Sequence, residues 1–207
     1  MALLARTCAQ LSRQLSPVVL NASRFYATDS DSFLKHKREY AFNNFFDTNN
    51  NKVMDWNDFQ IILDKIKATR GLTTLEYEAA RGALSDIWES LLEAAGKQKT
   101  ATEITLEEWQ RMWKTGATKK WEKPYQGFLF ELFNRGDQII EKDSYIEVMT
   151  MHGKDANEAK ECFEKITKDE DGDPIQAIDK SRFTSLWKEY FHKGISDAPG
   201  NFLFGKV

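Results

Sequence analysis

Residues 47–58 carry oxygen-bearing side chains at a spacing that suits a hard metal ion. Calcium takes six to eight oxygen ligands, and carboxylates supply the charge that attracts it. Side-chain oxygens stand at the first, third, fifth, ninth and twelfth places, and the seventh offers its backbone carbonyl: Asp47, Asn49, Asn51, Val53, Asp55 and Asp58. We expect these six residues to bind Ca²⁺, with Asp55 acting directly or through a water. The alternative, an Asn-rich polar turn without an ion, does not explain a match over twelve positions.

Two positions depart from the EF-hand calcium loop that this stretch otherwise matches. Lys52 stands sixth, where the motif has Gly. That position usually has a positive φ, which costs other residues on the order of 1 kcal/mol. Asp58 stands twelfth in place of Glu, and its shorter side chain makes two-oxygen coordination harder. Because fewer ligands suit Mg²⁺, we expect a moderate Ca²⁺ site for which Mg²⁺ competes.

Helical hydrophobic spacing covers the chain from residue 33 onward and places this loop between two helices. Capping boxes at Thr73–Glu76 and Thr105–Glu108 open two of the later helices, the first of them running to about residue 95. Further helices are expected at 33–46, 56–69, 121–134, 142–151, 155–167 and 180–192. No apolar run resembles a strand of more than a few residues.

An apolar residue recurs in the loop of each helix pair, with an aromatic residue five positions later. The four combinations are Met54 with Phe59, Ile104 with Trp109, Ile140 with Tyr145, and Ile178 with Phe183. Such a repeat marks helix–loop–helix units, and in EF-hands the apolar residue joins neighbouring loops through a short β-bridge. The sequence therefore predicts an all-α fold of four EF-hand-like units in two pairs, over residues 27–115 and 116–207.

The second and third loops have lost the ligands for an ion. In the second, Lys97, Lys99 and Ala101 stand first, third and fifth, and two ammonium groups repel a cation. Glu108, in twelfth place, is better explained by its capping box. The third loop, residues 134–138, is one residue too short in this register, and Arg135 stands where a carboxylate is needed.

The fourth loop is acidic but lacks the register of a calcium loop. Pro174 would stand sixth, where its fixed negative φ forbids the turn, and Lys180 would stand twelfth. We expect a solvated acidic turn. A second, irregular metal site formed by Asp169, Asp171 and Asp173 is the alternative.

Residues 1–28 differ in composition from the rest of the chain. They contain no Asp or Glu, and they carry Arg6, Arg13 and Arg24 among Ser, Thr and Leu residues. An amphipathic, acid-free, Arg-bearing segment is typical of a mitochondrial transit peptide. The sequence predicts import into the mitochondrial matrix and removal of residues 1–26; a basic tail on a cytoplasmic protein is the alternative.

A reporter fusion tests this targeting prediction. Residues 1–35 fused to a fluorescent protein should colocalise with mitochondria, and the mature chain should begin near Ala27. A diffuse cytosolic signal would overturn the prediction.

Composition narrows the function further. The chain has 207 residues, with 29 basic and 32 acidic side chains and a net charge of -3, which gives no electrostatic footprint for nucleic acid. No apolar run approaches the roughly 18 residues that cross a membrane. Two cysteines, Cys8 and Cys162, exclude a disulfide scaffold. Because the sequence has no phosphate loop and no nucleophile elbow, we expect a protein that is not an enzyme. We also expect it to be a monomer.

The four units, with the first loop intact and the last degraded, resemble the sarcoplasmic calcium-binding protein and calexcitin family. The long gap between residues 54 and 104 and the Asp at the twelfth loop position are similar to that family. So is the segment 197–205, which in the family packs between the two halves. The resemblance implies a compact, closed EF-hand protein that binds Ca²⁺ and Mg²⁺ and has no enzymatic chemistry.

Three functions compete on these grounds. The first is an ion buffer or ion-stabilised protein. The second is a sensor that opens toward an unknown protein partner, for which the few methionines, Met54, Met112, Met149 and Met151, offer little flexible surface. The third is a carrier of a luciferin-like small molecule, since coelenterazine-binding photoproteins share the family's architecture. Six Trp residues are compatible with such a cavity, but core packing explains them equally.

Overall fold

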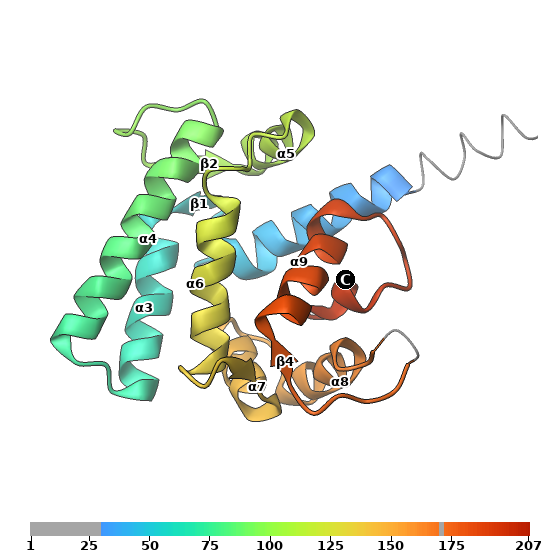
Figure 1. Cartoon of the computed structure of the whole chain (residues 1–207). Helices are drawn as coiled ribbons and strands as arrows, with labels where there is room; N and C mark the ends of the chain where they lie inside the picture. The colour runs from blue at the N-terminus through green and yellow to red at the C-terminus, as the bar shows by residue number, and fades with distance from the viewer. Residues whose placement is uncertain (1–29, 170–171) are drawn as a thin grey trace, which may run out of the picture.

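The computed structural model describes residues 30–169 and 172–207. The predicted transit peptide, Cys8 and Asp171 lie outside these residues. Figure 1 shows helices α3 and α4 side by side at one end of the molecule and α7 and α8 at the base. Helix α6 lies between the α3–α4 pair and α9. Among the described helices, none is long and apolar enough to cross a membrane.

Eight helices account for most of the described residues. The first runs from residue 30 and ends in a π-helical turn, η1 (Phe42–Phe46). The others are α3 (Trp56–Arg70), α4 (Thr74–Ala94), α5 (Leu106–Thr115), α6 (Glu122–Asn134), α7 (Lys142–Met151), α8 (Ala156–Ile166) and α9 (Lys180–His192). A short 3-10 helix, η2 (Pro199–Phe202), lies in the C-terminal tail. The predicted all-α fold is confirmed, with helix ends within a few residues of the expected positions.

The predicted capping signals set the helix boundaries. The Thr73 backbone N–H donates to the Glu76 carboxylate at 2.9 Å, and the Glu76 N–H donates to the Thr73 hydroxyl at 3.3 Å. Gly71 ends α3 in the left-handed conformation, with φ 68°. Since only glycine adopts this conformation at little cost, α3 stops there and the chain turns into α4.

Two short antiparallel ladders join the loops in pairs. Strand β1 (Val53–Asp55) pairs with β2 (Glu103–Thr105), and Met54 lies opposite Ile104. Strand β3 (Ile139–Ile140) pairs with β4 (Ile178–Asp179), and Ile140 lies opposite Ile178. The β-bridges predicted from the repeated apolar positions are therefore observed, and the aromatic residue five positions after each is buried.

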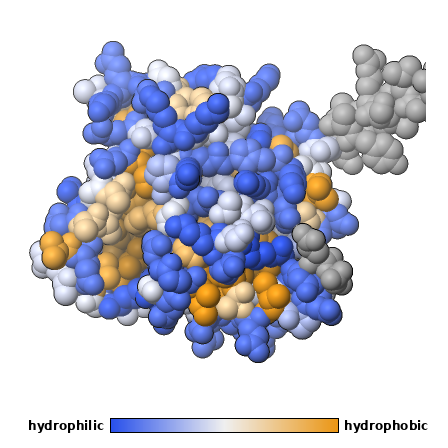
Figure 2. Space-filling model, in the orientation of Figure 1, coloured by the Kyte–Doolittle hydropathy of each residue, from blue (hydrophilic) through white to orange (hydrophobic). Residues whose placement is uncertain are grey.

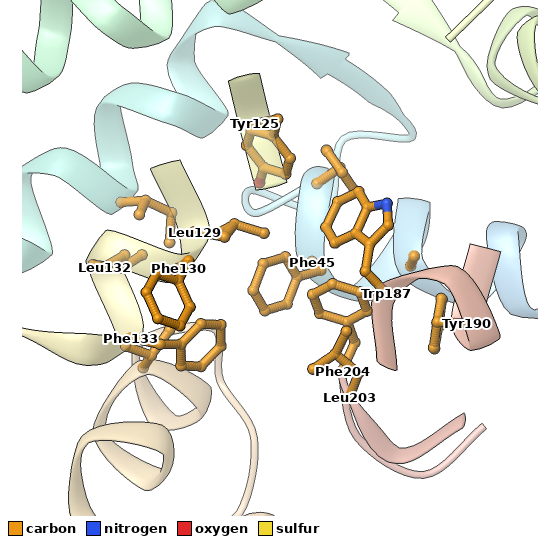
Figure 3. Packing of buried hydrophobic residues seen from close by; sticks show 14 of the residues in the cluster. Phe45, Tyr125, Leu129, Phe130, Leu132, Phe133, Trp187, Tyr190, Leu203 and Phe204 are labelled. Carbon is orange, nitrogen blue, oxygen red and sulfur yellow. The ribbon is translucent and has the colours of Figure 1, made fainter. Parts of the chain in front are cut away.

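One hydrophobic core extends across both pairs of units. The Phe46 ring lies 4.7 Å from the Trp109 ring and 5.0 Å from the Tyr125 ring, which joins the first helix to α5 and α6. In the C-terminal tail, Phe204 is fully buried, with its ring 4.7 Å from that of Phe45 and 4.9 Å from that of Tyr190. Figure 3 shows this cluster. The tail thus packs between the first helix and α9.

A buried lysine ties the same three segments together by hydrogen bonds. The Lys37 ammonium donates to the backbone carbonyls of Glu189 and Lys193, at 2.8 and 2.7 Å, and to the side-chain oxygen of Asn201 at 2.8 Å. Burial lowers the pKa of Lys37 to about 8. The three acceptors compensate for the desolvation of this side chain, and the sequence analysis did not foresee its role.

Candidate metal centre

The loop 47–58 begins where the π-helical turn of the first helix ends and finishes inside the first turn of α3. Phe45 and Phe46 are buried in the core and hold the entering helix, and Phe59 fixes the exiting one. Asp47 and Asp58 therefore face inward from the two ends of the loop, and each is only 2% exposed. Buried carboxylates require compensation by hydrogen bonds or by a cation.

The loop backbone folds around these two carboxylates. Asp47 accepts from the backbone N–H groups of Asn51 and Lys52, both at 3.0 Å. Asp58 accepts from the N–H groups of Asn49, at 3.0 Å, and Asp55, at 2.8 Å. Four loop amides thus point at the two buried charges, so both ends of the predicted ligand set are brought together by the local fold.

The remaining predicted ligands lie on the same loop and bond to one another. The side-chain oxygen of Asn49 accepts from the Asn51 N–H at 2.9 Å, and that of Asn51 accepts from the Val53 N–H at 3.1 Å. The Asn51 side-chain amide donates to the Asp55 carboxylate at 2.9 Å. The other Asp55 oxygen accepts from the Asn57 N–H and caps α3. This capping by Asp55, together with Asp58, forms a capping box that the sequence analysis missed.

The electrostatics of the loop favour a cation. Burial raises the pKa of Asp58 to about 6, an increase that its two backbone donors reduce and the charges of Asp55 and Asp47 reinforce. In the described residues, no three His, Cys, Asp or Glu side chains gather into a metal site on their own. The donor set therefore depends on the Asn amides and the Val53 carbonyl as well. Three carboxylates with neutral oxygens between them are chemistry that fits Ca²⁺.

Lys52 has the backbone conformation predicted for the sixth loop position. Its φ is 75°, and Asn50 also lies in the left-handed region with φ 58°. A residue with a side chain is strained at such a φ, which glycine adopts freely. Lys52 is therefore strained in its backbone, and it adds one positive charge to the loop.

We predict that Lys52→Gly tightens calcium binding. Relief of strain of about 1 kcal/mol corresponds to roughly fivefold in affinity, and loss of the ammonium adds to it. Calorimetric titration of both proteins measures the difference, and Lys52→Met, which removes the charge but keeps the strain, separates the two contributions. An unchanged dissociation constant for the Gly variant would show that strain at this position does not limit binding.

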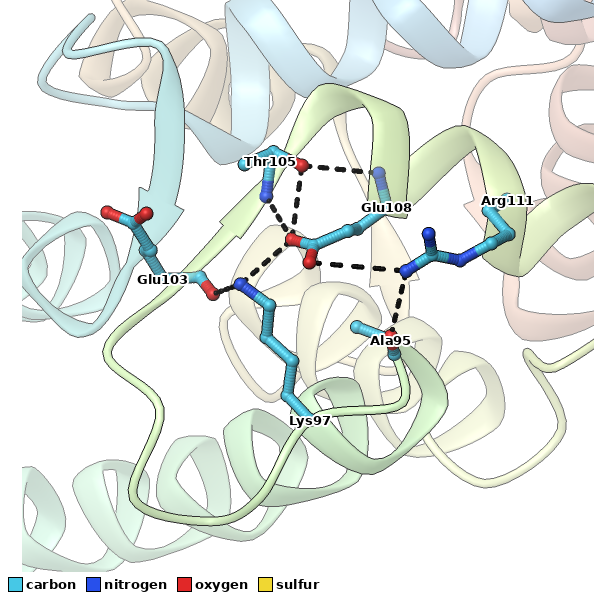
Figure 4. Close-up of polar contacts among 6 residues, drawn as sticks. All are labelled: Ala95, Lys97, Glu103, Thr105, Glu108 and Arg111. Atoms are coloured by element: carbon cyan, nitrogen blue, oxygen red, sulfur yellow. Dashed lines mark hydrogen bonds and ion pairs between the residues drawn. The ribbon is translucent and has the colours of Figure 1, made fainter.

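The second loop holds an ammonium among its own acceptors. The Lys97 Nζ lies 2.9 Å from a carboxylate oxygen of Glu108 and donates to the Glu103 carbonyl at 2.7 Å (Figure 4). No residue from 97 to 108 has a positive φ, so the first half of this loop departs from the conformation of the first loop. Lys99 turns outward to Glu89 on α4.

The third and fourth loops also lack a calcium-loop arrangement. Arg135 pairs with Glu147 on α7, where Arg70 of α3 also binds at 2.8 Å. In the fourth loop, Lys168 and Pro174 form an antiparallel bridge, and the Asp169 carboxylate accepts from the Asp173 N–H at 2.8 Å. Asp169 and Asp173 are exposed, in keeping with a solvated acidic turn. The structure does not describe Asp171, so the irregular second site stays untested.

Comparison with known proteins finds relatives that match most of this chain. No family model matches the chain. The chain is 30% identical to calexcitin-1 of Caenorhabditis elegans over 184 residues, which cover 87% of this chain and 90% of the relative. It is 26% identical over 187 residues to sarcoplasmic calcium-binding proteins I, III and IV of Branchiostoma lanceolatum, covering 85% of this chain and 98% of theirs.

Solved structures share the fold. The sarcoplasmic calcium-binding protein from amphioxus matches 84% of this chain and 98% of its own, with a TM-score of 0.67 and 21% identity. The coelenterazine-binding protein from Renilla muelleri matches 86% of this chain and 98% of its own, with a TM-score of 0.64 and 13% identity. The identity to calexcitin-1, over most of both chains, shows that the chain belongs to the sarcoplasmic calcium-binding protein and calexcitin family.

Proposed function

We propose that this protein binds one Ca²⁺ ion in the loop 47–58 and acts as an ion buffer or ion-stabilised protein. The observation that carries the proposal is the pair of buried carboxylates, Asp47 and Asp58, which the loop backbone surrounds. The names of its relatives, sarcoplasmic calcium-binding proteins among them, support the choice of ion. The short twelfth ligand, Asp58, makes Mg²⁺ a competitor for the site.

The closely packed core supports this function over that of a calcium sensor. A sensor uses ion binding to open a helix pair and expose a flexible apolar groove. Here the second loop, which pairs with the first, holds the ammonium of Lys97 against Glu108. The Phe46 ring packs against Trp109 of the first pair of units and Trp121 of the second. On the face drawn in Figure 2 hydrophilic residues dominate, and hydrophobic ones gather in smaller areas.

Calcium should therefore raise stability without opening the core. Binding to the folded state alone contributes about 2.7 kcal/mol at a hundredfold excess over Kd, which is roughly 5–10 °C in Tm for a chain of this size. Thermal unfolding and ANS fluorescence, each measured with Ca²⁺ and then with EDTA, test this. A large calcium-dependent rise in ANS fluorescence would reject the closed core and favour the sensor.

The interior offers little room for a luciferin-like ligand. A cavity beside Asp58, lined by Phe45, Tyr125 and His152 among others, has a volume of 20 Å³, which is space for about one water. The Phe45 and His152 rings stack there at 3.7 Å. A larger hollow of 510 Å³ between α6 and α9 is an open groove at the surface. We therefore favour ion binding over the carrier function, although the fold is shared with a coelenterazine-binding protein.

We further infer that the chain has no reaction of its own and works as a monomer in the mitochondrial matrix. Support for the first inference comes from its relatives, whose names describe calcium-binding proteins, and from the closed packing. Buried Cys162, whose thiol pKa is raised to about 11 by burial, is not a reactive nucleophile. The location depends on the acid-free segment 1–28 and on the reporter experiment above.

A further inference from the structure

The second loop contains an internal cation at the place where its sequence has lost the ligands for an ion. In EF-hand register, Glu103 is the seventh residue of this loop and Glu108 the twelfth, the positions whose carbonyl and carboxylate face a bound ion. Both are hydrogen-bonded to the Lys97 ammonium, at 2.7 and 2.9 Å (Figure 4). The side chains of Lys97 and Glu108 are 21% and 19% exposed, so this ion pair is largely shielded from water.

Neighbouring groups keep Glu108 in its charged form. Burial alone would raise the pKa of Glu108, but hydrogen bonds from Thr105 and Lys97 outweigh it, and the pKa lies below its ordinary value. Glu108 thus remains a carboxylate. The Arg111 guanidinium lies 4.0 Å from its second oxygen and donates to the Ala95 carbonyl at the end of α4. Cations are favoured at the carbonyl end of a helix. The end of α4, the second loop and α5 therefore meet around two positive side chains, Lys97 and Arg111.

One of the two acceptors of Lys97, the Glu103 carbonyl, belongs to the strand that faces the first loop. In the β1–β2 ladder, Glu103 lies opposite Asp55 and Thr105 lies opposite Val53. Asp55 and Val53 are the ninth and seventh residues of the proposed calcium loop. Fixing the Glu103 carbonyl therefore fixes the strand against which two of the proposed ion ligands are held.

We propose that Lys97 acts as a tethered cation that replaces the metal ion of the second loop and positions β2 for ion binding by the first loop. The effect of this proposal on calcium affinity rests on the proposed function of loop 47–58. Its effect on the order of the β1–β2 ladder does not. The second loop is then held by its own side chain at every calcium concentration. The first loop binds its ion against a partner that is already ordered, without cooperativity between the two.

The test compares Lys97→Met with Lys99→Met in the full chain. Both variants remove one positive charge from the same loop, but Lys99 is 77% exposed and pairs only with Glu89 among the described residues. Simple Coulomb repulsion predicts that either loss tightens Ca²⁺ binding. The positioning role predicts the opposite for Lys97→Met, a weakening of roughly threefold relative to Lys99→Met. Equal or tighter binding by Lys97→Met would overturn the proposal.

Hydrogen exchange of the metal-free protein gives a readout that does not depend on calcium. Lys97→Met should speed amide exchange in residues 53–55 and 103–105, while residues 139–140 and 178–179 of the other ladder stay at wild-type rates. Acceleration of both ladders, or of neither, would contradict a local positioning role. If the wild-type chain binds no calcium, the proposed function fails by itself, and the exchange experiment still decides the role of Lys97.

Discussion

Replacing both Asp47 and Asp58 with Ala should abolish calcium binding. Each carboxylate is buried at one end of the loop, and each accepts two hydrogen bonds from loop amides. Loss of two charged ligands at about 1.5–3 kcal/mol each corresponds to a weakening of more than roughly a hundredfold. Calorimetric titration of the double variant should therefore show no binding heat at concentrations that saturate the wild-type protein.

A charge-matched pair of substitutions controls for electrostatic effects. Asp169→Ala with Asp173→Ala removes two carboxylates from the exposed turn of the fourth loop and changes the net charge equally. This variant should bind calcium as the wild type does. If it loses an ion, the irregular acidic site of the fourth loop is real, and if the Asp47 and Asp58 variant keeps its ion, the assignment to the first loop is wrong.

The second large effect is expected at the C-terminal tail. Phe204→Ala should reduce the free energy of unfolding by about 3–5 kcal/mol, as full truncation of a buried Phe does. The ring contacts Phe45, Trp187 and Tyr190, so its loss leaves a cavity between the first helix and α9. For a chain of this length that decrease corresponds to a fall in Tm of roughly 6–20 °C.

Val207→Ala, in the same tail, provides the matched control. Val207 is one of the exposed large hydrophobic residues of the described chain, and its truncation should change Tm by less than about 1 °C. Chemical denaturation of both variants, followed by tryptophan fluorescence, measures the two effects. Equal stability of Phe204→Ala and Val207→Ala would show that the tail does not hold the halves together.

The fold could be predicted because its signals are local and repeated. Capping at Thr73 and Thr105 depends on residues three apart in the chain, and the hydrophobic period of each helix is visible within one helix. The β-bridges followed from a spacing that occurs four times, as Met54 opposite Ile104 illustrates. Long-range contacts carry no such signal. The three acceptors of Lys37 lie more than 150 residues away from it, and nothing in its sequence neighbourhood indicates them.

The residues of the candidate site could be predicted from the sequence, but their burial and hydrogen bonds could not. The six ligand positions and the positive φ of Lys52 follow from the loop pattern. The burial of Asp58 and the double use of Asp55, as a proposed ligand and as the cap of α3, arise only when the loop folds. Lys97 shows the limit most clearly. Its charge led us to expect no ion in the second loop, but the contacts of its ammonium with that loop's own acceptors are something no spacing rule predicts.

Calorimetric titration of the full chain with Ca²⁺, with and without millimolar Mg²⁺, tests the central claim most directly, because it counts the ions. The loop 47–58 has an oxygen donor at each of the six proposed ligand positions, and in the second loop Lys97 contacts the loop's own acceptors. We therefore expect a single Ca²⁺ per chain, bound with a simple one-site isotherm whose apparent affinity falls when Mg²⁺ is present. No binding, or two or more ions per chain, would contradict this account.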